Sequence, residues 1–414
     1  MGDGATPPAP LDPTPEIRAA AGRAGAHRLC DECFGRLFGQ WGHGYTNPER
    51  AAALRDAAAT RPTADAPCEV CHGTFDRLER WVDRLVAAGT DVEWHRFSCG
   101  SRWDPEALAR EELLWSEVGS AWGESARGAF NRELGKRLEA RTGAIGGPDH
   151  PEVVFLADLP LGHVDLTILP LYVQGRYRKH DRTLPQTRWP CRRCQGLGCA
   201  TCGGTGKTYA ESVEELVAAP FVRATGADGT RFHGMGREDI DARMLGEGRP
   251  FVLELRHPRR RTIDVAALAD EAARAAGGRI EVVGATAATA EDVARVKEAA
   301  PEKSYRVEVR GTVPEAKVKD ALSVVAARAI AQRTPTRVAH RRADRVRTRR
   351  IVDARVVAAD ADGFTLELRA EAGTYIKEWV EGDGGRTEPS LSGLVGVPLH
   401  VAALDVIAIH DQGR

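Results

Sequence analysis

Eight of the nine cysteines form four Cys-x-x-Cys pairs, a spacing that indicates metal binding or redox chemistry. One such pair supplies two thiolates from a single tight turn, and two pairs complete the closed four-sulfur site that structural zinc prefers. The first group consists of Cys30, Cys33, Cys68 and Cys71. We expect zinc here to stabilise a segment that is too small to build a core of its own.

The second group lies within CRRCQGLGCATCGGTG, residues 191–206, and consists of Cys191, Cys194, Cys199 and Cys202. The glycines allow the backbone to fold back around a metal ion, and the tandem repeat resembles the zinc repeat of DnaJ-type chaperones. The sequence therefore predicts one or two structural zinc ions in all, with redox-active or vestigial thiols as the alternative for each group. No histidine or carboxylate stands in a ligand position, which disfavours a catalytic zinc.

Three carboxylates, Glu238, Asp239 and Asp241, lie in a glycine-punctuated loop within FHGMGREDIDARMLGEGRPF, residues 232–251. A carboxylate in such a loop can act as a nucleophile or as a general base. The residue types alone do not show which of the three acids is used.

Arginine is concentrated in two segments, although the formal net charge of the chain is only -1. Residues 333–350, here called the arginine tract, carry eight arginines and a histidine against one aspartate, and residues 256–261 read RHPRRR. Clusters this dense are typical of surfaces that face phosphate groups. Genomic base composition weakens the evidence of any single arginine, and a solvated charged hairpin is the alternative for the arginine tract.

The chain of 414 residues is long enough for two or three domains, each with its own core. We expect a cytoplasmic protein, because the sequence has neither an apolar run of bilayer length nor the basic-then-apolar order of a secretory signal. Disulfides are rare in that compartment, which favours metal binding by the paired cysteines. Cys99, the ninth cysteine, is expected to be a buried apolar residue.

The periodicity of apolar residues predicts the elements that must position these side chains. In the first half, helices are expected over residues 74–89 and as one long stretch over 104–143, and strands over 91–100, 152–159 and 163–179. The second half is expected to contain strands over 249–258, 280–288, 303–311, 350–376 and 401–409, with helices over 263–277 and 315–332. Strands outnumber helices and several are adjacent, which favours an α+β fold with a mixed or antiparallel sheet and helices on one face.

The loop GREDIDARMLGEGRPF resembles the catalytic-aspartate loop of pseudouridine synthases, and specifically that of the archaeal-type tRNA enzyme that modifies the TψC arm. Five further motifs of that family occur in the expected order, across roughly residues 170 to 400. They are GRYRKHDRTLPQT, SVEELV, KSYRVEVRG, RTPTRVAHRRADRVRTRR and GTYIKEWVEGDGGRTEPSLSGLVG. Six matches in register could hardly arise by chance.

The resemblance implies that Asp239 is the catalytic aspartate and that the reaction uses no metal or organic cofactor. The carboxylate either attacks C1' of the target nucleotide or removes the proton from C2', and both routes stay open. Because the target base must be flipped out, Tyr305 is expected to stack on it. Tyr375 matches a substrate-contacting position, Ile376 supplies an apolar floor, and Lys377 matches the basic residue that pairs with the carboxylate.

Basic residues are expected to bind the RNA around this centre. Arg237 is expected to hold the catalytic loop or a neighbouring phosphate. Arg176, Arg178 and Lys179 form a basic segment with Tyr177 inside it, which is typical of a loop that grips RNA. Arg341 and Arg342 lie in the arginine tract, which resembles the loop that in this family closes on the substrate arm. Spacing alone would not support these roles, since a tyrosine in a strand is more often a core residue and a lone lysine is usually solvated.

Composition and resemblance together predict four parts. Residues 1–15 are expected to be a disordered leader, residues 16–75 a zinc-binding segment, and residues 76–170 a THUMP-like module that grips the tRNA. Residues 171–414 would form the pseudouridine synthase catalytic domain, with residues 191–206 as an insertion in which zinc braces a turn.

The function implied is that of a tRNA pseudouridine synthase that modifies uridine 54, uridine 55 or both, with tRNA as its partner and no obligatory protein partner. A non-catalytic zinc and RNA-binding protein is one alternative, but a binder would not need Asp239, Tyr305 and Lys377 together. A DnaJ-like chaperone is another, although the chain has no His-Pro-Asp tripeptide of a J-domain and its zinc repeat is short.

Overall fold

The computed structural model describes residues 11–60, 66–326 and 328–411. The chain divides into two compact units, one of Met1–Leu169 with Arg259–Arg261 and one of Pro170–Pro258 with Thr262–Arg414. Most of the predicted leader, residues 1–10, lies outside the described residues, and the first helix begins at Pro15. Within the described ranges, no helix is both long and apolar enough to cross a membrane.

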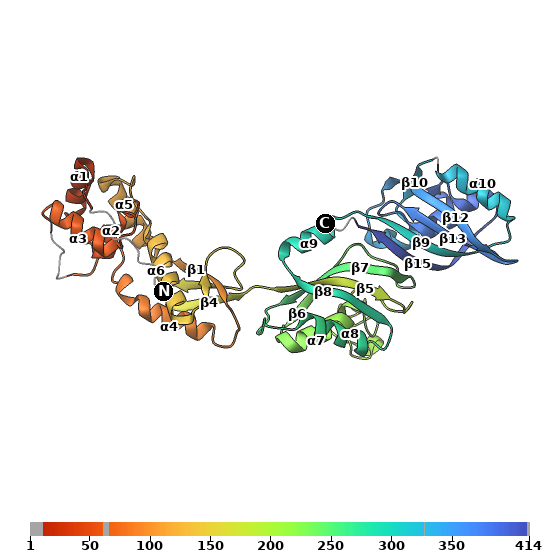
Figure 1. Cartoon of the computed structure of the whole chain (residues 1–414), viewed down its shortest axis with the longest axis horizontal. Helices are drawn as coiled ribbons and strands as arrows, with labels where there is room; N and C mark the ends of the chain where they lie inside the picture. Colours follow the sequence, from red (N-terminus) through yellow and green to blue (C-terminus); the bar gives the residue numbers. More distant parts are fainter. Residues whose placement is uncertain (1–10, 61–65, 327, 412–414) are drawn as a thin grey trace, which may run out of the picture. The chain divides into compact units, whose positions relative to one another are not determined.

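The first unit combines small helices around the first cysteine group with a helix-covered sheet (Figure 1). Its helices are α1 (Pro15–Ala24), α2 (Asp31–Arg36), α3 (Asn47–Ala57), η1 (Phe75–Arg77), α4 (Leu78–Ala88), α5 (Pro105–Val118) and α6 (Ala126–Thr142). Its strands are β1 (Arg96–Arg102), β2 (Ile145–Gly146), β3 (Val153–Asp158) and β4 (His163–Ile168), in the order β2-β1-β3-β4. The strand β1 runs parallel to β2 and β3, and β4 closes the sheet antiparallel to β3.

Two predicted elements of this half are broken in the structure. The stretch 104–143 forms two helices because Gly119 takes a φ of +102°, which ends α5, and the Ser125 side chain then caps α6. The stretch 163–179 forms two strands, β4 and β5 (Leu171–Lys179), which belong to different units and are separated by Pro170. A proline offers no N–H to a sheet, so it is a natural break between strands.

The second unit is built on an eight-stranded sheet, and nearly all of its pairs are antiparallel. The strand order is β12 (Ile351–Ala359), β13 (Gly363–Ala370), β9 (Glu302–Arg310), β15 (His400–His410), β7 (Arg243–Arg256), β5 and β8 (Ile280–Ala288), and β6 (Gly229–Gly234) also pairs with β7. The pair between β15 and β7 is parallel, which makes the sheet mixed, as predicted.

Helices pack on this sheet, and the same unit contains a small second sheet. The helices are α7 (Val213–Thr225), α8 (Val265–Ala275), α9 (Ala290–Glu298), α10 (Glu315–Ala326), α11 (Ile376–Glu381) and α12 (Leu391–Val395), with 3-10 turns η2 (Ala200–Cys202), η3 (Thr336–Arg341) and η4 (Asp383–Gly385). In Figure 1, α7 and α8 lie together beside β6 and β8. The small sheet has the order β11 (Val346–Arg349), β10 (Ile330–Arg333), β14 (Thr387–Glu388).

The helix predicted over residues 315–332 ends at Ala326, and its last residues belong to β10 instead. The alternating burial of β10 explains this, because Ile330 and Gln332 point inward while Ala331 and Arg333 are exposed. The hairpin of β10 and β11 carries most of the arginine tract, with η3 at its turn.

The strand β7 changes partner along its length, and the loop with the three carboxylates lies at that change. Arg243 and Met244 pair with β15, whereas residues 251–256 pair with β6. The chain leaves β6 at Gly234 and re-enters the sheet at Arg243, so residues 235–242 connect the two halves of the sheet.

Gly246 allows the strand β7 to approach β15 closely. Its φ is +59°, and a Cβ built there would lie 2.1 Å from the carbonyl oxygen of Ile407 in β15. We expect Gly246→Ala to lower the free energy of unfolding by more than about 2 kcal/mol, because backbone strain of about 1–3 kcal/mol adds to a clash with backbone. Gly278→Ala is the control, since Gly278 has a φ of +80° with no atom within 4 Å of such a Cβ. Thermal unfolding of both variants checks this, and equal losses would contradict it.

Candidate active site

The structure separates the three carboxylates of the loop by their surroundings. The side chain of Glu238 is almost completely buried, and its Oε2 lies 2.8 Å from Nε of Arg249, which is equally buried. The hydroxyl of Tyr177 donates to the same carboxylate at 2.9 Å. Burial raises the pKa of Tyr177 well above its usual value, so this hydroxyl stays a donor. Glu238 is therefore a structural residue that anchors the loop to β5 and β7.

Donors from β5 and the segment after it hold the loop backbone. Lys179 donates through Nζ to the carbonyl oxygens of Leu184 at 2.9 Å and Ile240 at 2.7 Å. The side chain of Arg182 donates to the carbonyl of Asp241 at 2.9 Å, and Gln186 donates to the carbonyl of Gly236 at 3.0 Å. These bonds fix the loop in the free protein, which is the condition for a preorganised catalytic group.

Asp239 is partly exposed and lies between two cations. Its side chain is 28% exposed, and Nη1 of Arg337 donates to its Oδ1 at 2.7 Å. The Nζ of Lys377 lies 3.8 Å from its Oδ2. The same ammonium contacts Asp241 more closely, at 2.7 and 2.9 Å. Burial opposes the ionisation of Asp241, but the hydrogen bond and charge of Lys377 outweigh it and lower the pKa of that acid.

The aromatic and apolar residues predicted for the site come from two elements. Tyr305 lies on β9 and is 8% exposed; burial raises its pKa to about 12, and the nearby charge of Asp239 acts in the same direction. Tyr375 occupies the N-cap position of α11, and the buried Ile376 is the first residue of that helix. The buried side chain of Gln332 accepts from the N–H of Tyr375 and donates to its carbonyl, both at 2.9 Å, so the turn before α11 is rigid.

The segment GRYRK is not the predicted basic loop. It belongs to the strand β5, in which Tyr177 and Lys179 point into the core. Lys179 was predicted to bind RNA, but it is fully buried and is occupied by the loop carbonyls. Arg176 and Arg178 point outward and pair with Asp411 at 2.8 Å and Glu281 at 2.6 Å.

The remaining predicted RNA contacts lie around the loop and the arginine tract. Arg237 is exposed and makes no hydrogen bond or ion pair with any residue that the structure describes. Arg342 is exposed and donates to the hydroxyl of Tyr375 at 3.1 Å. Arg341 ends η3, and its side chain lies outside the described part of the structure. Arg261 of the RHPRRR cluster instead donates to the carbonyls of Glu152 and Leu169 in the first unit.

Both cysteine groups have the geometry of a four-sulfur metal site. In each group the four sulfur atoms lie within 4.8 Å of one another. The Sγ atoms of Cys30 and Cys71 are 3.6 Å apart, and those of Cys199 and Cys202 are 3.7 Å apart. A tetrahedral zinc with Zn–S bonds of about 2.3 Å separates its sulfurs by about 3.8 Å, so both groups fit such an ion.

The stretch with the second cysteine group closes on itself. Pro190 and Lys207 form an antiparallel bridge, and the N–H of Thr208 donates to the carbonyl of Trp189 at 2.9 Å. The exposed tip carries Leu197, which is 93% exposed. Cys99, the ninth cysteine, is half-buried in β1, and burial raises the pKa of its thiol to about 11.

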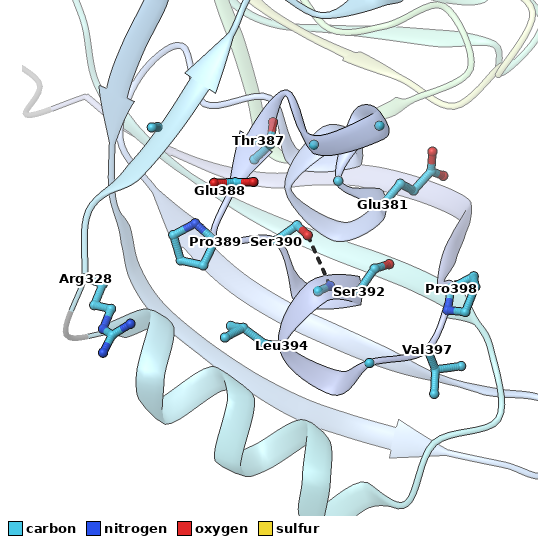
Figure 2. Close-up of a pocket in the computed structure, with 16 residues that line it drawn as sticks. Arg328, Glu381, Thr387, Glu388, Pro389, Ser390, Ser392, Leu394, Val397 and Pro398 are labelled. Atoms are coloured by element: carbon cyan, nitrogen blue, oxygen red, sulfur yellow. Dashed lines mark hydrogen bonds between the residues drawn. The ribbon is translucent and has the colours of Figure 1, made fainter.

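A cavity of about 880 Å³ lies away from the carboxylate loop, between η4, β14 and α12 (Figure 2). Its lining includes Arg328, Glu381 and Glu388, together with several glycines. None of the residues predicted for the active site lines it. Its charges are of both signs, and Ser390 already accepts from the N–H of Gly393 at 3.2 Å, so the lining selects no obvious ligand.

Comparison with known families identifies the family of the chain. Residues 172–410 match the model described as "Pus10, C-terminal", and residues 81–158 match the archaeal Pus10 THUMP domain. The chain belongs to the Pus10 family. The predicted fold class, with its THUMP domain, and the predicted class of enzyme, an RNA pseudouridine synthase, are thereby confirmed.

Individual Pus10 relatives match over nearly the whole chain. The tRNA pseudouridine synthase Pus10 of Methanopyrus kandleri is 39% identical over 93% of this chain and 96% of its own. That of Halorubrum lacusprofundi is 41% identical over 96% of each. Among solved structures, a Cbf5-Nop10-Gar1 complex is similar at a TM-score of 0.30 and 16% identity, over 57% of this chain and 58% of the other, which is too low to identify a fold by itself.

The different burial of the loop acids predicts different effects on stability. Glu238→Gln removes the only charge that compensates the buried Arg249 within the described ion pairs, so we expect a loss of about 3–5 kcal/mol. Asp239→Asn should cost about 1 kcal/mol or less, because this side chain is partly exposed. Calorimetric unfolding of the two variants checks this, and a larger loss for Asp239→Asn would contradict the assignment.

Proposed function

We propose that the protein converts uridine 54, uridine 55 or both in the TψC loop of tRNA to pseudouridine, with Asp239 as the catalytic carboxylate. Membership of the Pus10 family, whose matched relatives are named tRNA pseudouridine synthases, supports the substrate. The observation that carries the choice of Asp239 is its position: it is partly exposed between Arg337 and Lys377. Glu238 is buried in an ion pair, and both oxygens of Asp241 are bonded to Lys377.

The reaction breaks the bond between N1 of uracil and C1' of ribose, turns the base and rejoins it through C5, after which C5 loses its proton and N1 gains one, so the product is an isomer of the substrate. Asp239 would either attack C1' or remove the proton from C2', and neither step needs an electron acceptor or a metal. Arg337 occupies Oδ1 of Asp239, whereas Oδ2 accepts no hydrogen bond within the described residues. Oδ2 is therefore the oxygen available to the substrate.

The neighbouring residues suit a flipped-out uridine. Tyr305 would stack on the base, and its high pKa keeps the phenol neutral there. Tyr375 and Ile376 would line the pocket from the start of α11, and Lys377 would keep the site positive. Lys179 supports the loop by donating to the carbonyl of Ile240 and does not contact the substrate.

Exposed arginines would bind the phosphates of the folded RNA, which is recognised mainly by shape. Arg237 in the loop and Arg342 in the arginine tract are exposed. The side chain of Arg345, also in the tract, makes no hydrogen bond or ion pair within the described residues. Arg176 and Arg178 would contribute only if a phosphate displaced Asp411 and Glu281. We place this activity in the cytoplasm, with no obligatory protein partner.

We also propose structural zinc in both cysteine groups. Four thiolates leave no open coordination position for a substrate, which is typical of zinc that stabilises a fold. In the first group, three of the four cysteines are buried among small helices. In the second group, the metal would hold a loop whose exposed residues contribute no core.

Pseudouridine formation tests the proposed role of Asp239. Asp239→Asn should form no detectable pseudouridine on an unmodified tRNA transcript and should bind that tRNA within about threefold of the wild type, because only the reacting carboxylate is lost. Carbodiimide-dependent reverse-transcription stops map the product at positions 54 and 55, and a native gel measures binding. Asp241→Asn is the matched control and should keep activity. Pseudouridine formed by Asp239→Asn would remove Asp239 from the reaction.

Metal content tests the proposed zinc sites. Elemental analysis of the purified protein should give about two zinc ions per chain, and Cys33→Ser and Cys202→Ser should each lose about one. Cys33→Ser should also lower the unfolding temperature of the first unit, since metal binding is coupled to folding there. Cys99→Ser is the control and should keep both ions. Zinc absent from wild type purified without acid or chelator would contradict the proposal.

A further inference from the structure

Arg337 joins two carboxylates from separate elements. It lies on η3 within the arginine tract, and its Nη1 donates to Oδ1 of Asp239 at 2.7 Å. Its Nε donates to Oε1 of Glu378 at 2.5 Å, and its Nη2 lies 3.4 Å from Oε2 of the same carboxylate. Glu378 belongs to α11 and is buried. The two carboxylates thus hold the planar guanidinium in one orientation.

The backbone around Arg337 is also fixed. The N–H of Thr336 donates to Oδ2 of Asp383 at 3.0 Å, and Val338 on the other side is buried. Burial opposes the charge of Arg337, but the hydrogen bond to Glu378 and the charge of Asp239 outweigh it and raise the pKa of the guanidinium. Arg337 is therefore a charged group held in place, unlike Arg345 of the same tract, whose side chain makes no hydrogen bond or ion pair within the described residues.

Lys377 contacts Asp239 less closely. Its Nζ is 3.8 Å from Asp239, beyond hydrogen-bonding distance, and bonds to Asp241 instead. The hydrogen bond that orients the carboxylate of Asp239 in the free protein thus comes from Arg337.

We propose that Arg337 is a positioning residue for the reaction, which orients the carboxylate of Asp239 through Oδ1 and is itself oriented by Glu378. The inference rests on Asp239 being the catalytic acid. It places the positioning group inside the arginine tract, so the segment that would bind RNA phosphates also sets the reacting carboxylate. A phosphate-binding role for Arg337 is the competing account, but three of its five N–H groups already bond to the two carboxylates.

Single-turnover kinetics with saturating enzyme and unmodified tRNA test this. Arg337→Ala should lower the rate of pseudouridine formation by about 10- to 100-fold, because a misplaced reacting group costs about that much, while tRNA affinity changes less than about threefold. Arg337→Lys should recover part of the rate. Glu378→Gln should slow the reaction in the same way, and the double variant Arg337→Ala/Glu378→Gln should be no slower than Arg337→Ala, since the two residues act in series.

Partial rescue by lysine separates positioning from a loss of fold. Lysine restores a cation that can donate to Oδ1 of Asp239 but lacks the fork that Glu378 holds, so the rate of Arg337→Lys should lie between those of Arg337→Ala and the wild type. A residue that only stabilised the fold would lower the unfolding temperature together with the rate. Arg355→Ala is the control, because Arg355 on the strand β12 pairs with Glu367 on β13 and should leave the rate unchanged.

Each other outcome has a clear meaning. Wild-type rate in Arg337→Ala, with weaker tRNA binding, would overturn the proposal in favour of a phosphate contact. An equal loss of rate in Arg337→Ala and Arg337→Lys would also overturn it. Activity in Asp239→Asn, measured in parallel, would instead refute the proposed function and would not depend on Arg337.

Discussion

The buried ion pair between Glu238 and Arg249 is the constraint on which the candidate active site depends. Two charges can remain in a protein interior only when each satisfies the other and further hydrogen bonds complete the pair. Tyr177 and the strands β5 and β7 supply that setting. Because Asp239 follows Glu238 directly, the pair fixes the start of the segment that carries the proposed catalytic acid. The loop thus gains its position from a residue other than that acid.

A second set of contacts holds Asp239 and comes from a segment much later in the sequence. The hairpin of β10 and β11 provides Gln332, which holds the turn before α11, and Arg337, which bonds to Glu378 of that helix. The cost of ordering the site is therefore met when the protein folds, and little of it remains to be met when RNA binds. The change of partner along β7 lets both supports converge on one loop.

The sequence predicted the features that depend on local spacing. The cysteine groups are local in this sense, and alternation of apolar residues located most strands. Only the resemblance distinguished Asp239 from Glu238 and Asp241. In the structure these acids differ in burial, and strands distant in the sequence determine that burial. The contact of Arg337 with Asp239 joins residues 98 positions apart, which no spacing rule shows. Lys179 was misplaced because a basic and aromatic pattern does not tell which face of a strand points inward.

The closed base of the second cysteine group has a consequence for how this chain can vary. Since Pro190 and Lys207 are paired, the excursion between them begins and ends at one place on the surface. Lengthening, shortening or exchanging that excursion changes loop-closure entropy only slowly and leaves the distance between β5 and α7 unaltered. The insertion is thus a position at which new recognition surface can evolve, or be grafted by design, without disturbing the geometry of the carboxylate loop.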